Sequence, residues 1–96
     1  LAINEVLKAF IENTSSNLAI IEEAISNSDK KTIASISHRM IPMMNQLDVK
    51  ETVLLLQQLE ECEKTELSPE ELKTIFNEIN EKTTRLLTLL QKELIL

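Results

Sequence analysis

The residue of this chain best suited to do chemistry is its only histidine, His38. An imidazole changes charge near neutral pH, and its neutral form offers a nitrogen nucleophile. His38 lies in the stretch 30–47, which has no acidic residue although the chain has sixteen. The same stretch holds Lys30, Lys31, Arg39 and all three methionines. In a chain of net charge −6, this local excess of cations marks a candidate site.

A helical wheel places His38 away from the apolar side of its stretch. With Ile36 set at zero and about 100° per residue, His38 falls at about 200°. The apolar residues that lie within about 80° of zero define the predicted buried side. They are Ile33, Ile36, Met40, Met43 and Leu47. We therefore expect an exposed histidine, either a functional residue or an incidental one on the surface.

The predicted surroundings of His38 are small and apolar. Ala34 lies one turn before it, and Ile41 and Pro42 lie one turn after it. Exposed apolar patches with a polar rim are often protein contact sites. A proline inside a helix costs roughly 3 kcal/mol, because it removes one backbone donor and crowds the carbonyl four residues earlier. Pro42 is therefore either a benign kink or a residue that shapes the surface around His38.

The composition excludes several classes of function. With no glycine, the chain cannot form a glycine-rich phosphate loop. With no Tyr or Trp, two Phe and a negative net charge, it is not expected to bind nucleic acid. The single cysteine, Cys62, cannot form an intrachain disulfide or a cysteine-rich metal site, so we expect a small, half-buried apolar residue. The sequence indicates no metal, no cofactor and no autonomous catalysis, and it leaves open whether a longer parent is an enzyme.

The sequence also sets expectations about location. No run of about 18 apolar residues is present, so this segment is not expected to insert into a membrane. No signal peptide is visible. Because the chain begins at Leu1 rather than Met, we expect it to be a fragment of a longer polypeptide. A cytoplasmic location is the default prediction, and it is compatible with a membrane-anchored parent.

Apolar residues recur at steps of three and four along the chain, which predicts helices. Polar clusters separate four such stretches and supply signals at which helices start. These signals are Ser28 or Asp29 for the second helix, Asp48 with Glu51 for the third, and Ser68, Pro69 and Glu71 for the fourth. We therefore predict one all-α domain over residues 1–96, an antiparallel four-helix bundle.

The residues around His38 resemble the histidine-phosphotransfer (HPt) domain of bacterial phosphorelays. The resemblance rests on Ser37-His38-Arg39-Met40, on Met43-Met44-Asn45-Gln46-Leu47 and on Leu59-Glu60, and it extends over nearly the whole chain. The family has an apolar residue two positions after the histidine, a lysine three after and a glycine four after. Met40 fits this pattern, whereas Ile41 and Pro42 replace the lysine and the glycine. The lost lysine puts its charge-neutralising role in doubt.

The resemblance implies a phosphorelay intermediate. His38 would accept a phosphoryl group from an aspartyl-phosphate on a response-regulator receiver domain, and would pass it to the aspartate of another receiver. The receiver would supply Mg²⁺ and a lysine, so this domain would need no cofactor. The implied parent is a hybrid two-component sensor histidine kinase.

The resemblance also implies supporting residues near His38. Glu60 either hydrogen-bonds to the imidazole Nδ1 and fixes its tautomer, or is solvated. Asn45 either hydrogen-bonds to a phosphoryl oxygen or is solvated. Arg39, and less readily Lys31, would replace the missing lysine. The residues expected to dock the receiver are Ala34, Ile41, Pro42 and Met44.

Two alternatives compete with this interpretation. The dimerisation helix of a sensor histidine kinase has an acid directly after its histidine and a proline five residues on. Here Arg39 follows the histidine and Pro42 is four residues on, and an arginine cannot accept a proton. No nucleotide-binding segment is present, so the kinase alternative is disfavoured. The second alternative is a structural helical-bundle interaction module without phosphotransfer.

Overall fold

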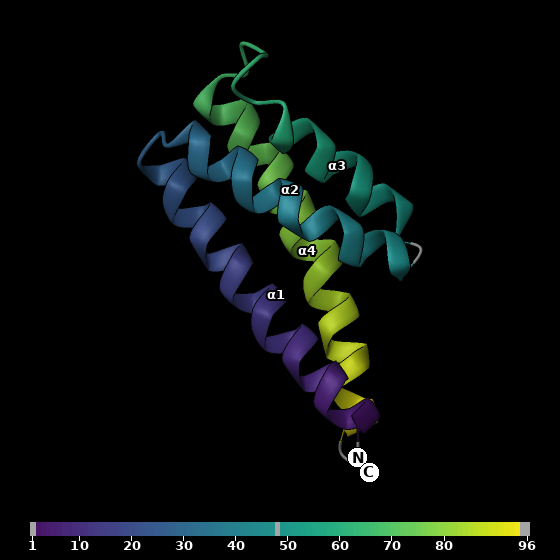
Figure 1. Ribbon diagram of the computed structural model, residues 1–96. Helices are drawn as coiled ribbons and strands as arrows, with labels where there is room; N and C mark the ends of the chain where they lie inside the picture. Colours follow the sequence, from purple (N-terminus) through teal and green to yellow (C-terminus); the bar gives the residue numbers. More distant parts are fainter. Residues whose placement is uncertain (1, 48, 95–96) are drawn as a thin grey trace.

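The computed structural model describes residues 2–47 and 49–94, and all regular secondary structure within them is helical. The four helices are α1 (Ala2–Ser26), α2 (Lys30–Gln46), α3 (Lys50–Glu60) and α4 (Pro69–Leu94). They pack as a four-helix bundle (Figure 1). The prediction of an all-α fold with four helices is confirmed.

Side chains of the predicted types begin two of the helices. At α2, the Thr32 backbone N–H donates to Asp29 Oδ1 (3.2 Å) and the Thr32 hydroxyl donates to Oδ2 (2.6 Å). These bonds hold the pKa of the Asp29 carboxyl below its usual value. At α4, the Glu71 N–H donates to Ser68 Oγ and the Ser68 N–H donates to Glu71 Oε1, each at 3.1 Å. This reciprocal pair is a capping box.

The start of α3 differs from the prediction. Val49 is its capping residue, and no side chain accepts a hydrogen bond there. Asp48, the predicted cap, lies outside the described residues. Glu51 accepts a hydrogen bond from Lys82 Nζ (2.6 Å) on α4. This ion pair lowers the pKa of Glu51 and links the first turn of α3 to α4.

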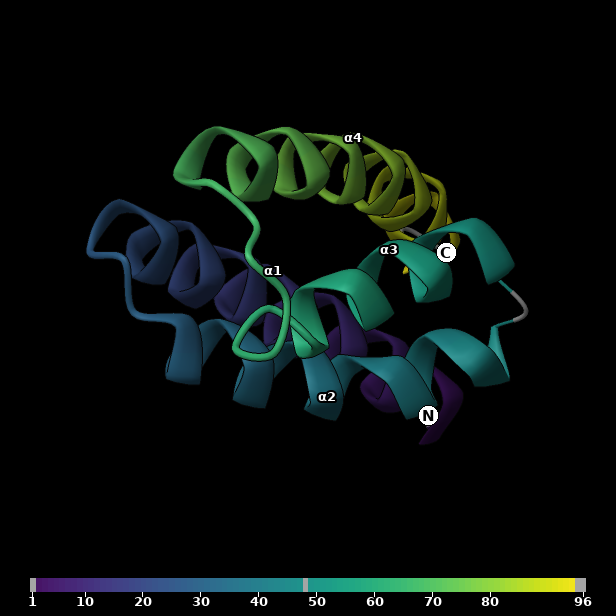
Figure 2. The same ribbon diagram turned by 90° about the horizontal axis from the view of Figure 1, so that it is seen from above.

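Each helix packs against two neighbours. α1 contacts α2 and α4, and α3 also contacts α2 and α4. Viewed from above, α2 and α4 lie on opposite sides of the bundle (Figure 2). The longer helices α1 and α4 continue past α2 and α3, so the start of α1 and the end of α4 lie at one end of the molecule (Figure 1). Because α2 contacts only α1 and α3 within the described residues, its remaining side faces solvent.

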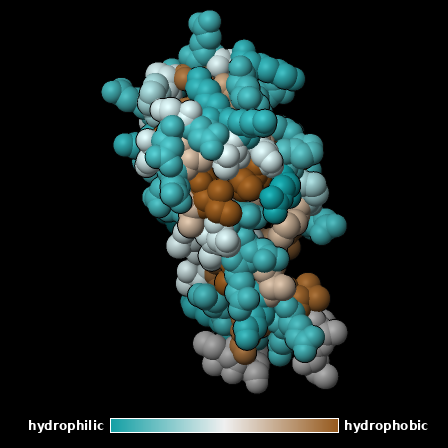
Figure 3. Space-filling model, turned by 60° about the vertical axis from the view of Figure 1, so that its left-hand side comes forward, coloured by the Kyte–Doolittle hydropathy of each residue, from teal (hydrophilic) through white to brown (hydrophobic). Residues whose placement is uncertain are grey.

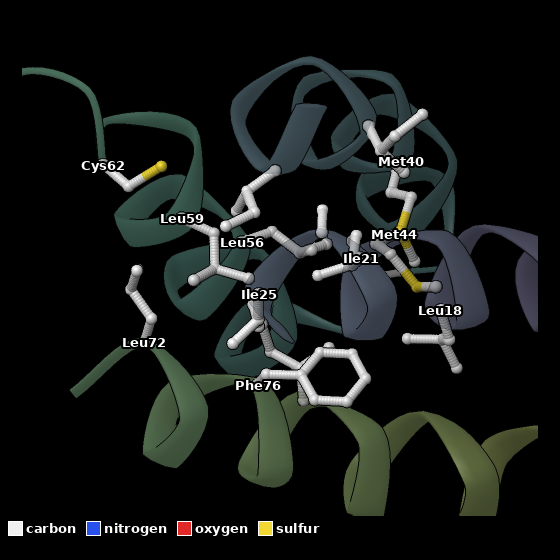
Figure 4. Packing of buried hydrophobic residues seen from close by; sticks show 14 of the residues in the cluster. Leu18, Ile21, Ile25, Met40, Met44, Leu56, Leu59, Cys62, Leu72 and Phe76 are labelled. Atoms are coloured by element: carbon white, nitrogen blue, oxygen red, sulfur yellow. The ribbon is translucent and has the colours of Figure 1, made fainter. Parts of the chain in front are cut away.

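The core is built almost entirely of aliphatic and methionine side chains contributed by all four helices (Figure 4). Its fully buried large members are Ile21, Ile33, Met40, Met44, Leu56, Leu59 and Ile79. Cys62 is also buried, and its Sγ donates to the Lys30 carbonyl (3.4 Å). Burial raises the pKa of the thiol, which therefore acts as a small core residue. On the face drawn in Figure 3, a contiguous apolar patch lies near the middle of the molecule and is bordered by hydrophilic side chains.

The buried side of α2 is rotated from its predicted position. Met44 is 1% exposed, whereas Leu47, predicted to point inward, is 41% exposed. Ser37 is fully buried as well. The buried arc therefore runs from Ile36 to Ser37, and its centre lies about 30° from the centre of the predicted residues. A wheel weighted by hydropathy cannot find this arc, because it counts the small, tightly packed serine as polar.

Candidate functional site

His38 lies on the solvent-facing side of α2, and 73% of its side chain is exposed. The rotation of the buried arc leaves it still about 150° from the centre of that arc. Arg39, Pro42 and Asn45 are exposed on the same helix. The prediction of an exposed histidine is confirmed. Its imidazole is therefore accessible to a macromolecular partner.

Glu60, the last residue of α3, is paired with this histidine. Its Oε2 and the His38 Nδ1 are within hydrogen-bonding distance, and the Glu60 side chain is 32% exposed. A carboxylate acceptor selects the tautomer with a proton on Nδ1, because only a ring N–H can donate to it. The second ring nitrogen, Nε2, then carries the free lone pair. Of the two alternatives for Glu60, the structure shows the contact with the histidine.

The packing of α2 against α3 holds this pair together. Met40 lies two residues after His38 and Leu59 directly precedes Glu60, and both are buried in the shared core. The His38 and Glu60 side chains therefore emerge from the edge of a packed interface. Rigid placement of this kind reduces the reorganisation that a reaction requires.

Two hydrogen bonds connect the segment after α3 to Lys30, the first residue of α2. Lys30 Nζ donates to the Leu67 carbonyl (3.4 Å), and the Cys62 Sγ donates to the Lys30 carbonyl. These contacts join residues more than thirty positions apart in sequence. Sequence reasoning missed both of them, because no local pattern signals a side chain that bonds to a distant backbone carbonyl.

The cationic side chains of the stretch 30–47 differ in whether they already have a bonding partner. Lys30 is engaged with the Leu67 carbonyl. Lys31 and Arg39 are exposed, and neither forms an ion pair with any residue of the described ranges. Arg39 is adjacent to His38 and about 100° around the helix. Lys31 lies two turns away, about 10 Å along the axis, which makes Arg39 the nearer cation.

Asn45 is exposed two turns after His38. The rise along a helix separates the two residues by about 10 Å. The Asn45 carbonyl accepts from the Leu47 N–H, whereas its side chain has no hydrogen-bond partner among the described residues. A direct bond from Asn45 to a group on the imidazole is therefore less favoured than solvation.

The predicted docking residues fall into three environments. Pro42 is exposed, and Ala34 and Ile41 are half-buried. Ile41 also packs against the core, which its predicted position on the exposed side did not indicate. Met44 points inward (Figure 4), and the prediction that it lies at the surface is wrong. The apolar surface beside the histidine consists of Ala34, Ile41 and Pro42.

Residues 2–47 and 49–94 contain neither a cluster of metal-ligating side chains nor a candidate membrane-spanning helix. No three His, Cys, Asp or Glu side chains there could hold a metal ion together. None of the helices in these ranges combines the length and apolarity needed to cross a bilayer. Comparison of the chain with protein-family models, curated proteins and solved structures finds no match in any of the three.

Proposed function

We propose that this chain is a phosphorelay intermediate whose phosphoryl acceptor is His38. The single observation that carries the proposal is the contact between His38 Nδ1 and Glu60 on a largely exposed imidazole. This arrangement directs the nucleophilic Nε2 toward solvent, where a partner domain can present a phosphoryl group. The donor would be an aspartyl-phosphate of a response-regulator receiver domain, and the final acceptor would be the aspartate of another receiver.

The bonds formed and broken in this phosphoryl transfer balance without a cofactor on this chain. The Nε2 lone pair attacks phosphorus, the bond between phosphorus and the aspartyl oxygen breaks, and its electron pair stays on the departing carboxylate. The imidazole ring gains positive charge as the new bond forms, and the Glu60 carboxylate on Nδ1–H stabilises that charge. Phosphoryl transfer depends mainly on positioning and charge stabilisation. The receiver would contribute Mg²⁺ and a lysine to its own phosphoryl site.

We further propose that the chain is an antiparallel four-helix bundle of the HPt type. It would be one domain of a longer hybrid sensor kinase in the cytoplasm. Four helices that each pack on two neighbours support the bundle architecture alone. The position of the start of α1 beside the end of α4 also supports it (Figure 1).

The experiment that tests this function is incubation with purified receiver domains that carry radiolabelled aspartyl-phosphate. We expect label to move to this chain from at least one member of a broad panel. The bound label should be acid-labile and base-stable, as phosphohistidine is. Absence of transfer from every receiver would favour the second candidate, an interaction module without covalent chemistry.

Glu60 should act as a positioning residue. Glu60→Ala removes the acceptor on Nδ1, and we expect transfer to slow by about 10- to 100-fold, the equivalent of one hydrogen bond to a charged group. Glu60→Gln keeps an acceptor oxygen, so it should recover part of the rate. Rapid-quench measurement of label on the chain tests both variants. Equal rates for Glu60→Ala and wild type would show that the contact has no role in transfer.

Arg39 should compensate for the cation that Ile41 cannot supply. Phosphohistidine carries added negative charge, and a nearby guanidinium would stabilise it. We expect Arg39→Ala to shorten the phosphohistidine lifetime or slow its formation, and Lys31→Ala to do much less, because Lys31 is two turns away. Adding Ile41→Lys to Arg39→Ala should restore the lost lifetime or rate. If Arg39→Ala changes neither quantity, the receiver alone supplies the cation.

A further inference from the structure

The backbone carbonyl of His38 lacks its helical hydrogen bond. In an α-helix this oxygen would accept from the N–H of residue 42, four positions later. That residue is Pro42, which lies inside α2 and has no N–H. The helix nevertheless continues to Gln46. The residue that carries the imidazole therefore has a backbone acceptor without its regular helical donor.

Within residues 2–47 and 49–94, no side chain takes the place of the missing N–H. Side chains donate to backbone carbonyls elsewhere, as Lys30 does to Leu67 and Thr88 does to Thr84. None of the side-chain bonds in the described residues reaches the His38 carbonyl. In the isolated domain, water can satisfy this oxygen, because Pro42 is exposed.

Core packing does not explain the proline. A proline inside a helix is destabilising, and burial of its ring can offset the loss. Pro42 is exposed and belongs to the solvent-facing side of α2, so its ring contributes little to the core. What Pro42 does is remove the N–H that would otherwise donate to the His38 carbonyl, one turn before it.

The imidazole and the carbonyl do not interfere with each other. Side chains of a helix tilt toward its N-terminus, whereas its carbonyls point toward its C-terminus. A phosphoryl group on Nε2 and a hydrogen-bond donor on the carbonyl therefore approach from opposite ends of the same exposed face. A partner that covers this face can contact both at once.

We propose that the His38 carbonyl is a docking acceptor that receives a hydrogen bond from an N–H donor of the bound receiver domain. When a partner covers Pro42, it displaces the water on this oxygen, and an unpaired buried carbonyl opposes binding. A matching donor on the partner removes that penalty and fixes the register between the two domains. The inference rests on the proposed function, because the partner is the receiver that exchanges phosphoryl groups with His38.

Two chemically matched changes at position 42 test the inference. Pro42→Ala restores an N–H, which should occupy the His38 carbonyl within the helix and leave the receiver's donor unpaired. N-methylalanine at position 42, introduced by chemical synthesis of the 96-residue chain, lacks both the N–H and the ring. The probe is the receiver that labels the wild-type chain fastest in the panel. Its dissociation constant is measured by calorimetry.

We expect Pro42→Ala to melt at a higher temperature but to bind the receiver about 5- to 30-fold more weakly. N-methylalanine should recover most of the lost affinity. Wild-type affinity for Pro42→Ala would overturn the inference, and so would an equal loss in both variants, which would identify the ring as the contact. If no receiver labels the wild-type chain, the proposed function fails and the inference fails with it.

Discussion

Replacing His38 with glutamine is expected to abolish phosphoryl acceptance and leave the bundle folded. The substitution removes the nucleophilic Nε2, and an amide nitrogen does not replace it. The His38 side chain is 73% exposed, so the free energy of unfolding should change by no more than about 0.5 kcal/mol. Label transfer from a phosphorylated receiver measures the first effect, and thermal melting followed by circular dichroism measures the second.

Two results would contradict this expectation. Label on the His38→Gln variant at the wild-type level would place the acceptor on another residue. A melting temperature lowered by many degrees would show that the histidine supports the core. The glutamine amide can still donate to Glu60, so the variant keeps the contact between α2 and α3 while it loses the nucleophile.

Ile41→Glu is expected to produce the next largest loss of transfer, about 100-fold or more. Ile41 contributes to the apolar surface beside His38, and a docked partner would bury the new carboxylate without a counter-charge. Because Ile41 also packs against the core, we expect a moderate loss of stability, which the melting curve will show. The transfer rate is therefore compared at a temperature at which both proteins are fully folded.

Leu89→Glu provides the matched control for this variant. Leu89 is 60% exposed on α4, a helix that does not pack against α2 within the described residues. The same charge change there should leave the transfer rate at its wild-type value. If Leu89→Glu slows transfer as much as Ile41→Glu does, the loss comes from net charge. If Ile41→Glu transfers normally, the docking surface lies elsewhere.

The helices and the caps of α2 and α4 could be predicted because local chemistry determines them. Asp29 and Ser68 accept bonds from residues only three positions away, so the sequence holds both partners of each cap. The apolar steps of three and four residues give the helices in the same way. These predictions use information within one or two helical turns.

The environment of Met44 could not be predicted, because it depends on two neighbouring helices at once. α1 and α3 cover α2 from two sides, and the arc between them includes Ser37 as well as Met44. A pattern of hydropathy along one helix cannot show which of the adjacent residues Met43 and Met44 points into that arc. The inward prediction for Leu47 was wrong because Leu47 caps α2 after its last residue, Gln46, and is 41% exposed.

The pairing of His38 with Glu60 was only one of two alternatives at the level of sequence. The two residues are twenty-two positions apart, and their contact requires the register of α3 on α2. The resemblance to HPt domains suggested a polar partner at Glu60, but the residues alone also allowed a solvated carboxylate. The packing of the buried Met40 and Leu59 sets the register of α3 on α2, which the sequence pattern does not specify.

A nitrogen–phosphorus correlated nuclear magnetic resonance spectrum of the labelled chain will show whether His38 accepts the phosphoryl group and on which nitrogen. The protein, uniformly enriched in ¹⁵N, is phosphorylated by the most active receiver and recorded at neutral pH. Because Glu60 contacts the His38 Nδ1, the expected result is one phosphohistidine with phosphorus coupled to Nε2. Phosphorus coupled to Nδ1, or a receiver-treated chain with no phosphohistidine signal, would contradict it.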